Sequence, residues 1–442
     1  MKIQLSDHFT YGKLIRFTFS SIAMMIFTSV YGVIDGLFVS NYVGKTPFAA
    51  LNFIYPVIMM LGAVGFMFGT GGTALVAIAL GEGKKDKANK LFSLFVYTTI
   101  ICGISLALLG IIFIRPIGMF LGATGEMLDL CVLYARIVLM ALPMFMLQME
   151  FQNFFVTAEK PQLGLYMTVA AGVTNMVLDW LFIAVFEWEL AGAALATAFS
   201  QAVGGGLSLV YFIRKNSSLL RLTKLEFDGK ALVDACVNGS SELMSNISMS
   251  LVSMLYNVQL MKYAGENGVS AYGVLMYVSL VFLAIFIGYV IGTAPIFGFH
   301  YGAGNYEELK SLFKKSLVIV GSVSVFMVIA CNVLSIPLSE IFVGYDANLY
   351  EITKRGFFIY SFSFLFCGLC IFGSSFFTAL GDGLTSALIS FLRTLVFQVA
   401  AVMIFPIIWD IDGIWISIVV AECLAAIVTS IFLIIKRKKF HY

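Results

Sequence analysis

The two halves of this chain are related in sequence. When the chain is aligned with itself at an offset of 221 residues, half of its 442, Gly81 falls on Gly302 and Phe155 falls on Phe376. The same offset holds across most of each half without a net insertion. A repeat of this length predicts a duplicated structural unit whose two copies form one assembly.

The composition places both copies in a membrane. Hydrophobic residues make up 60% of the chain and charged residues 12%, and the mean hydropathy is +0.97. A soluble protein of this size needs far more charge to cover its surface. Apolar stretches of about 20 residues are long enough to cross a bilayer. The sequence predicts six such stretches in each half: 14–40, 48–80, 91–114, 128–156, 162–186 and 190–213, then 231–261, 268–299, 312–337, 352–379, 384–408 and 412–435.

Six spans in each half give both copies the same orientation, so we expect parallel repeats related by an axis along the membrane normal. The expected fold is an all-α integral membrane protein with 12 transmembrane helices in two pseudo-symmetric six-helix lobes. The lobes are residues 1–213 and 231–442, joined by a polar, basic linker at 214–230. Paired repeats in a membrane are typical of transporters, whose substrate site lies between the repeats.

The basic residues predict the orientation of the chain in the membrane. If both termini are cytoplasmic, the inner loops and tails hold 20 of the 27 Lys and Arg residues and the outer loops hold five. This bias follows the positive-inside rule. The first span has no small-residue cleavage site, so we expect it to be a membrane helix and not a signal peptide.

Enzyme motifs are missing from the sequence. It contains no GxxxxGK[ST], HExxH or GxSxG pattern, and its three histidines lie near the termini or at a helix end. The seven cysteines lie in apolar helical patterns, so they are expected to be buried small side chains. We therefore expect neither an enzyme nor a protein with a bound cofactor.

Polar residues inside predicted spans are the best candidates for function, because their burial is costly. Asp35, Asn175, Asp179 and Thr197 all fall in the outer half of the first lobe. At 1.5 Å per residue, Asp35 lies about 31 Å and Asp179 about 26 Å from the inner edge. Their oxygen atoms are suitable ligands for a proton or Na⁺. The alternative is that each of these residues only makes hydrogen bonds between helices.

The repeat strengthens the functional interpretation. At the offset of 221, none of the four counterparts in the second half is acidic. A role confined to packing would allow both copies to keep the polar set, so its presence in one lobe indicates a task of that lobe. The counterparts are, in order, Tyr256, Val396, Ala400 and Ile418.

The second half has its own polar pair, Glu242 and Asn246, four residues apart on one helix face. Glu242 would lie near the midplane, where it can meet a cationic substrate. The alternative is that Glu242 pairs with Arg393. For Arg136 and Glu422, the alternative to a functional role is an ion pair or a position in an outer vestibule. Asp129, Glu150 and Asp234 lie nearer helix ends, where snorkelling or contact with interfacial water explains their charge. Further candidates for the substrate cleft are Tyr31, Tyr256, Asn257, Met276, Tyr277 and Arg393.

Several stretches together resemble the multidrug and toxic compound extrusion (MATE) family, in particular its bacterial MepA-like branch. They are Val33-Ile34-Asp35-Gly36-Leu37-Phe38-Val39-Ser40, Asn175-Met176-Val177-Leu178-Asp179, Gly192-Ala193-Ala194-Leu195-Ala196-Thr197 and Phe299-His300-Tyr301-Gly302-Ala303-Gly304-Asn305-Tyr306. The resemblance covers essentially the whole chain.

The resemblance implies two lobes in a V shape that alternate between outward and inward openings, and export of organic, often cationic, drugs in exchange for H⁺ or Na⁺. It implies that Asp35, Asn175, Asp179 and Thr197 form the cation or proton site of the first lobe. Two features depart from other members. Ser20 stands where some have a helix 1 proline, and residues 357–378 contain no acidic residue, so a second-lobe Na⁺ site is not expected.

We therefore expect a multidrug efflux antiporter, a monomer in the bacterial plasma membrane whose partners are small-molecule drugs and the lipid bilayer, without nucleic acid. The main alternative is a lipid-linked oligosaccharide flippase of related architecture. A flippase would need a strongly basic central cleft, for which Arg136 and Arg393 are the only intramembrane basic residues. A membrane enzyme or receptor is a third class, which the repeat disfavours.

Overall fold

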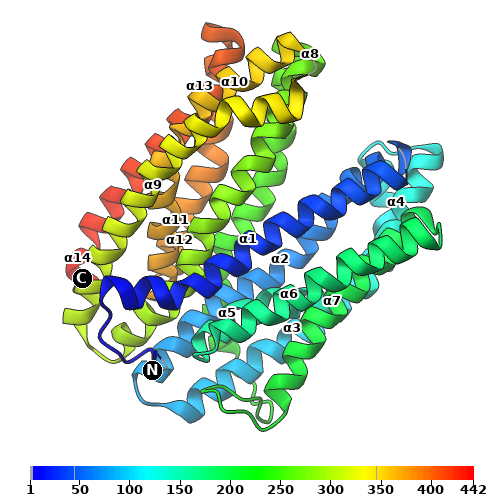
Figure 1. The fold of residues 1–442 in the computed structure, drawn as a ribbon. Coiled ribbons are helices and arrows are strands. Elements are labelled where there is room, and N and C mark those ends of the chain that lie inside the picture. The colour runs from blue at the N-terminus through cyan, green and yellow to red at the C-terminus, as the bar shows by residue number, and fades with distance from the viewer. Residues whose placement is uncertain (1–2, 44, 345) are drawn as a thin grey trace.

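The computed structural model describes residues 3–43, 45–344 and 346–442, and this part of the chain is helical with no strand. Figure 1 shows two helical bundles that meet near the two termini and splay apart toward the opposite end. The first bundle holds the blue to green helices α1–α7, and the second holds α8–α14 in green to red. The predicted all-α membrane fold is confirmed, and each of the twelve predicted spans lies on helical structure.

The helices of the first bundle are α1 (Tyr11–Tyr42), α2 (Lys45–Gly81), α3 (Lys85–Phe120), α4 (Gly125–Met140), α5 (Leu142–Thr157), α6 (Pro161–Asp179), the π-helix η1 (Trp180–Val185) and α7 (Glu189–Ile213). Those of the second are α8 (Gly229–Gly302), α9 (Tyr306–Val343), α10 (Ala347–Ser361), α11 (Phe364–Ala379), α12 (Gly383–Phe391), the π-helix η2 (Leu392–Val396), α13 (Phe397–Ile435) and α14 (Arg437–Phe440).

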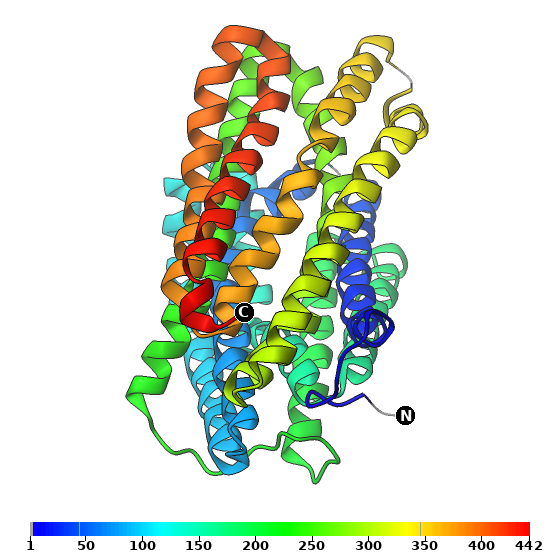
Figure 2. The same cartoon turned by 90° about the vertical axis from the view of Figure 1, so that its left-hand side faces the viewer.

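Two of these helices each contain the end of one span and the start of the next. α8 has 74 residues, about 110 Å if straight, which is far too long for one crossing. Its backbone breaks at Gly265, where φ is 60° and ψ is −153°, values that favour glycine. Figure 2 shows α8 rising in green and returning toward the lower end. α13 breaks in the same way at Trp409 and Asp410.

Two other spans are bent. α4 and α5 meet at an angle of 57°, and α10 and α11 meet at 49°. The first bend lies around Ala141, with Pro143 in the first turn of α5. Because these pairs occupy equivalent places in the two lobes, the bend is part of the repeated unit.

The turns between helices show how well the repeat is kept. Positive φ values occur at Gly83 and Gly304, which are 221 residues apart, but also at Glu159 and Gly381, which are 222 apart. The second lobe therefore contains one more residue between these turns, and the expectation of an alignment without insertions is wrong by one residue there. At an offset of 222, Asp179 falls on Ala401 in place of Ala400. The second lobe therefore lacks a carboxylate at the position equivalent to Asp179 with either offset.

The two lobes touch most closely where α2 packs against α8, near the chain termini. A methyl group on Gly239 would lie 2.0 Å from the carbonyl oxygen of Met67, and one on Gly302 would lie 2.2 Å from that of Ile78. Only glycine allows the two backbones to approach this closely. These contacts close this end of the protein, whereas the far ends of the bundles diverge (Figure 1).

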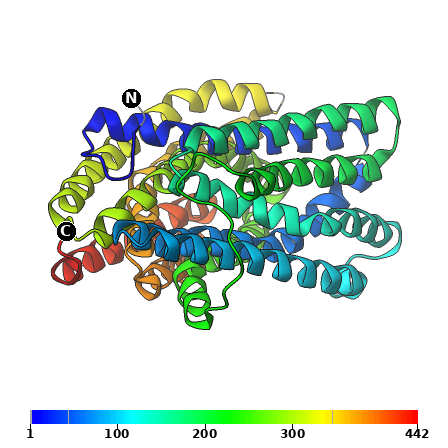
Figure 3. The ribbon, with the colours of Figure 1, turned by 90° about the horizontal axis from the view of Figure 1, so that it is seen from below.

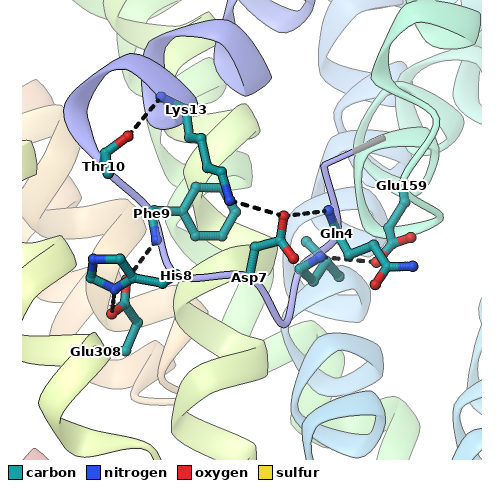
Figure 4. Close-up of polar contacts among 9 residues, drawn as sticks. Gln4, Asp7, His8, Phe9, Thr10, Lys13, Glu159 and Glu308 are labelled. Carbon is teal, nitrogen blue, oxygen red and sulfur yellow. Dashed lines mark hydrogen bonds and ion pairs between the residues drawn. The ribbon is translucent and has the colours of Figure 1, made fainter. Parts of the chain in front are cut away.

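The segment before α1 crosses this closed end and contacts both lobes (Figure 4). The amide of Leu5 donates to Oε1 of Glu159 in the first lobe at 2.8 Å. The amide of Phe9 donates to Oε1 of Glu308 on α9 at 2.9 Å, and His8 Nδ1 lies 2.6 Å from Oε2 of Glu308. Leu5 and Phe9 are fully buried. The N-terminal segment thus ties the two lobes together at the end where they meet.

Candidate cation and substrate sites

The polar residues predicted for the first lobe come together in the structure. Asp35 lies on α1, Asn175 and Asp179 on α6, and Thr197 on α7. The Asp35 carboxyl lies close enough to Asp179 and to the Asn175 side chain to interact with both. Asp179 is fully buried and Asn175 is 2% exposed. α6 gives way to the π-helix η1 directly after Asp179, and such interruptions are frequent at functional sites.

Many oxygen atoms of this group lack a hydrogen-bond donor. Both carboxylate oxygens of Asp179, Oδ1 of Asp35, Oδ1 of Asn175 and Oγ1 of Thr197 are buried without a hydrogen-bond partner in the part of the chain that the structure describes. Two ionised carboxylates cannot satisfy each other, since neither donates a hydrogen bond. A proton or a cation between them would supply what is missing. The described residues contain no group of three His, Cys, Asp or Glu side chains suited to a transition metal.

Three tyrosines surround the Asp35 carboxyl at electrostatic range: Tyr31, Tyr55 and Tyr134. Tyr31 was expected in the substrate cleft, and the structure places it beside Asp35. The Tyr134 hydroxyl also lies near Thr197, and its side chain is 1% exposed. Sequence analysis missed Tyr55 and Tyr134, because tyrosine is common in this chain and nothing local marks these two.

In the second lobe, Arg393 forms an ion pair with Glu422. Nε of Arg393 donates to Oε1 of Glu422 at 3.0 Å and to Oε2 at 2.9 Å. The side chains are 16% and 9% exposed, so the pair is largely buried. Arg393 lies in the π-helix η2. The alternative in which Glu242 neutralises Arg393 does not hold, because Glu422 takes that place. Glu242 lies within electrostatic range of Arg393 without a direct bond.

The other expected cleft residues are mostly packed inside the second lobe. Tyr256 is 1% exposed, donates to Oε1 of Gln398 at 2.7 Å and stacks on Tyr272 with ring centres 5.6 Å apart. Met276 packs against the hydrophobic core of the same lobe. Asn257 is half-buried, and Asn246 donates to the backbone oxygen of Glu242 at 2.8 Å. Tyr256 is therefore a core residue of the lobe, which corrects its assignment to an open cleft.

Glu150 corrects another expectation. It was predicted near interfacial water, but it is fully buried, and neither carboxylate oxygen has a hydrogen-bond partner among the described residues. The Thr99 hydroxyl on α3 lies near this carboxyl. The bend before α5 explains the difference, because it directs α5 into the lobe, against α2 and α3. The first lobe thus holds a third buried carboxyl, apart from Asp35 and Asp179.

Comparisons with known proteins place this arrangement in a context. A sequence model of the MatE family matches residues 20–181 and 243–404, one match in each half of the chain. The multidrug export protein MepA of Staphylococcus saprophyticus subsp. saprophyticus is 23% identical over 440 residues, which cover 95% of this chain and 93% of that protein. MepA of Staphylococcus aureus (strain MRSA252) is also 23% identical, over 430 residues, with the same coverage of both chains.

Solved structures agree in fold. A crystal structure of MATE in complex with MaL6 superimposes with a TM-score of 0.93 at 22% identity and covers 98% of both chains. The outward-facing conformation of a multidrug resistance MATE family transporter of the MOP superfamily gives a TM-score of 0.92 at 22% identity, covering 98% of this chain and 97% of that one. The arrangement of helices described above is therefore that of a known fold.

Proposed function

This chain belongs to the MatE family of membrane transporters, and from that premise we propose that it exports organic, often cationic, compounds in exchange for H⁺ or Na⁺. The relatives whose whole length it matches are named multidrug export proteins, which supports a range of drug-like substrates. A secondary transporter of this kind needs no prosthetic cofactor, since the ion gradient supplies the free energy.

The observation that carries the proposal is the facing pair of Asp35 and Asp179, with buried oxygen atoms that lack donors. One H⁺ or Na⁺ between the carboxyls lowers the cost of burying their charge. When the ion leaves, the two carboxylates repel each other, and α1 and α6 are driven to repack. The ion thereby biases the lobe between two arrangements through its different affinity for each. Asn175 and Thr197 complete the oxygen-rich site.

The substrate side of the proposal rests on the charges of the second lobe. Arg393 and Glu422 neutralise each other, so Glu242 is the surplus negative charge in this group. A surplus carboxylate near the midplane favours a cationic substrate between the lobes. The same pair argues against the flippase alternative, because the charge of Arg393 is already compensated and leaves no basic site for a pyrophosphate.

Exchange follows if the ion and the substrate destabilise each other's binding. Such coupling is reciprocal. If the bound cation lowers the affinity for the drug by a given factor, the bound drug lowers the affinity for the cation by the same factor. Coupling energies of about 1–3 kcal/mol, or about 5–150-fold in affinity, are typical. The first lobe then serves ion coupling, and the second supplies the charge that recognises the substrate.

We place both termini and the linker 214–230 in the cytoplasm of a bacterial cell, with the protein acting as a monomer in the plasma membrane. The basic residues support this orientation. Single cysteines introduced into the linker on a cysteine-free background test it. A membrane-impermeant maleimide is expected to label them only after cell lysis, and labelling in intact cells would refute the orientation.

The test of the coupling site is efflux of a cationic dye from proteoliposomes under an imposed pH gradient or an imposed Na⁺ gradient. Asp35→Asn and Asp179→Asn should each abolish efflux under the gradient that drives the wild type, since each removes an ion ligand with little change of shape. Asp129→Asn is the matched control, because this exposed carboxylate lies outside the group. Efflux at the wild-type rate in both test variants would disprove the proposed site.

Measurements of drug affinity across a range of pH distinguish the roles of the two lobes. Asp179→Asn should flatten the pH dependence of drug binding, whereas Glu242→Gln should weaken binding of cationic drugs and retain the pH dependence. Loss of the pH dependence in Glu242→Gln alone would move ion coupling to the second lobe.

A further inference from the structure

Arg136 is a charged residue in a membrane span without a partner. Its side chain is exposed, and it makes no hydrogen bond or ion pair within residues 3–43, 45–344 and 346–442. Arg393, which also lies deep inside a predicted span, is buried against Glu422. None of the functions proposed above uses Arg136, so its charge requires a separate explanation.

The side chain of Arg136 lies on the outer surface of the first lobe. α4 buries one face, which includes Leu128, Ala135 and Leu139, and exposes the opposite face, which includes Leu133, Arg136 and Met140. The buried face packs on α2, α3 and α7, all of the same lobe. In Figures 1 and 3, the connection from α3 to α4 lies at the end of the first lobe that is remote from the chain termini. Arg136 thus lies on a face of α4 that is left open by the helices on which α4 packs, and in a membrane such a face contacts lipid.

An uncompensated charge there is unfavourable. Arg136 lies 11 residues into α4, about 16 Å along the helix from its start at Gly125. An arginine near the centre of a span costs about 2.5–3.5 kcal/mol on insertion scales, and snorkelling toward the interface relieves part of this. A counter-charge within reach of the guanidinium would relieve more.

A groove lies beside this guanidinium. It has a volume of about 410 Å³ and runs between α3 and α4, lined by Arg136, Asp129 and apolar side chains that include Ile111, Leu133 and Met140. The carboxylate of Asp129 is engaged by Arg115, with Nη1 and Oδ1 3.0 Å apart. Asp129 lies seven residues, about 10 Å, before Arg136 on the same helix face. The groove thus has a polar end, where Arg115 and Asp129 form a neutral ion pair, and an apolar floor. The guanidinium of Arg136 in this groove is unpaired among the described residues.

We propose that this groove binds an anionic phospholipid, with its phosphate on Arg136 and one acyl chain along the apolar side chains of α3 and α4. The guanidinium can hold two phosphate oxygens at once, which an ammonium group cannot do. The lipid comes from the leaflet at the end of the protein opposite its termini.

The second lobe supplies an internal comparison. α10 begins 222 residues after α4, so Arg136 corresponds to Phe358, which is 57% exposed. A residue whose side chain only contacts lipid is expected to be apolar, as Phe358 is. The arginine is therefore specific to the first lobe, the one that holds Asp35 and Asp179. Two residues away on the buried face of α4, Tyr134 lies near Thr197 and within electrostatic range of Asp35. A lipid on Arg136 would hold the helix that carries this tyrosine.

Retention of phosphatidylglycerol by the purified full-length protein, measured by native mass spectrometry, tests the proposal. The wild type should bind one phosphatidylglycerol about fivefold more tightly than Arg136→Gln does. Arg136→Phe, which copies the second lobe and removes the burial cost of the charge, should lose the same binding and fold well. Arg115→Gln is the control, since it opens the neighbouring ion pair and leaves Arg136 in place.

Two further ligands define what is bound. Phosphatidylcholine should bind more weakly than phosphatidylglycerol to the wild type and equally to Arg136→Phe. Glycerol 3-phosphate, which has the phosphate without the acyl chains, should not compete. Equal phosphatidylglycerol binding by the wild type and both Arg136 variants would overturn the proposal, and competition by glycerol 3-phosphate would replace the lipid with a soluble phosphate.

Discussion

The ion pair between Arg393 and Glu422 offers a quantitative test of the second lobe. Glu422→Gln keeps the size of the side chain but leaves the guanidinium of Arg393 uncompensated. Both oxygens of Glu422 lie within 3.0 Å of Nε, and the two side chains are 16% and 9% exposed. Breaking a buried pair by removing one partner costs about 3–5 kcal/mol of the free energy of unfolding. Because Glu242 is at electrostatic range of Arg393, we expect a loss near the lower end of that range, about 3 kcal/mol.

The assay is denaturant unfolding of the purified protein in mixed micelles, for Glu422→Gln, Arg393→Gln and the double variant. Removing both charges leaves neither Arg393 nor Glu422 as an unpaired ion, so the double variant should be less destabilised than the sum of the single variants by about 2 kcal/mol. Arg115→Gln and Asp129→Asn provide the control. That pair is 51% and 66% exposed, and its coupling should be about 0–1 kcal/mol.

Additive effects in the double variant would show that Arg393 and Glu422 do not interact, and the structural account of the second lobe would be refuted. If Glu242→Gln made the loss in Glu422→Gln larger, Glu242 would be identified as the substitute partner of Arg393. The same variants also bear on transport, since loss of Glu422 should draw Glu242 toward Arg393 and weaken the binding of cationic drugs.

Three further variants test how the lobes are joined. Gly302→Ala brings a Cβ within 2.2 Å of a backbone oxygen of α2, so cysteine cross-links between α2 and α8 should form more slowly than in the wild type. Gly265→Ala, at φ 60° and ψ −153°, should cost about 1–3 kcal/mol in unfolding experiments. Glu308→Gln should speed hydrogen exchange of the Phe9 amide, whereas the exposed neighbour Glu307→Gln should leave it unchanged; equal exchange in both would contradict the N-terminal contact.

The membrane spans and the family were available from the sequence, because both depend on local properties. A helix in a bilayer must satisfy its backbone hydrogen bonds within its own segment, so a run of apolar residues is enough to locate it. The motifs around Asp35, Asp179 and Thr197 are contiguous stretches, and they identified the family that the comparisons then showed. The repeat was also visible, although a fixed offset concealed the one-residue difference between Glu159 and Gly381.

The partners of buried charges were decided only by the tertiary structure. The sequence does not decide whether Glu242 or Glu422 pairs with Arg393. Residue number sets how deep a side chain lies along its helix, but it does not set the rotation of the helix or which helices lie beside it. The packing of α13 against η2 brings Glu422, 29 residues away, onto the guanidinium, and leaves Glu242 unpaired.

In the first lobe, too, some features could be predicted from the sequence and others depend on the tertiary structure. Its apolar runs and its polar motifs follow from sequence, since each is carried by one helix. The burial of Glu150 required the 57° bend before α5, and the positions of Tyr55 and Tyr134 around Asp35 required three helices to pack together. What a single helix carries can be predicted from its own residues, whereas a site shared by several helices depends on their relative rotation and approach, which are fixed by side-chain packing across the whole lobe.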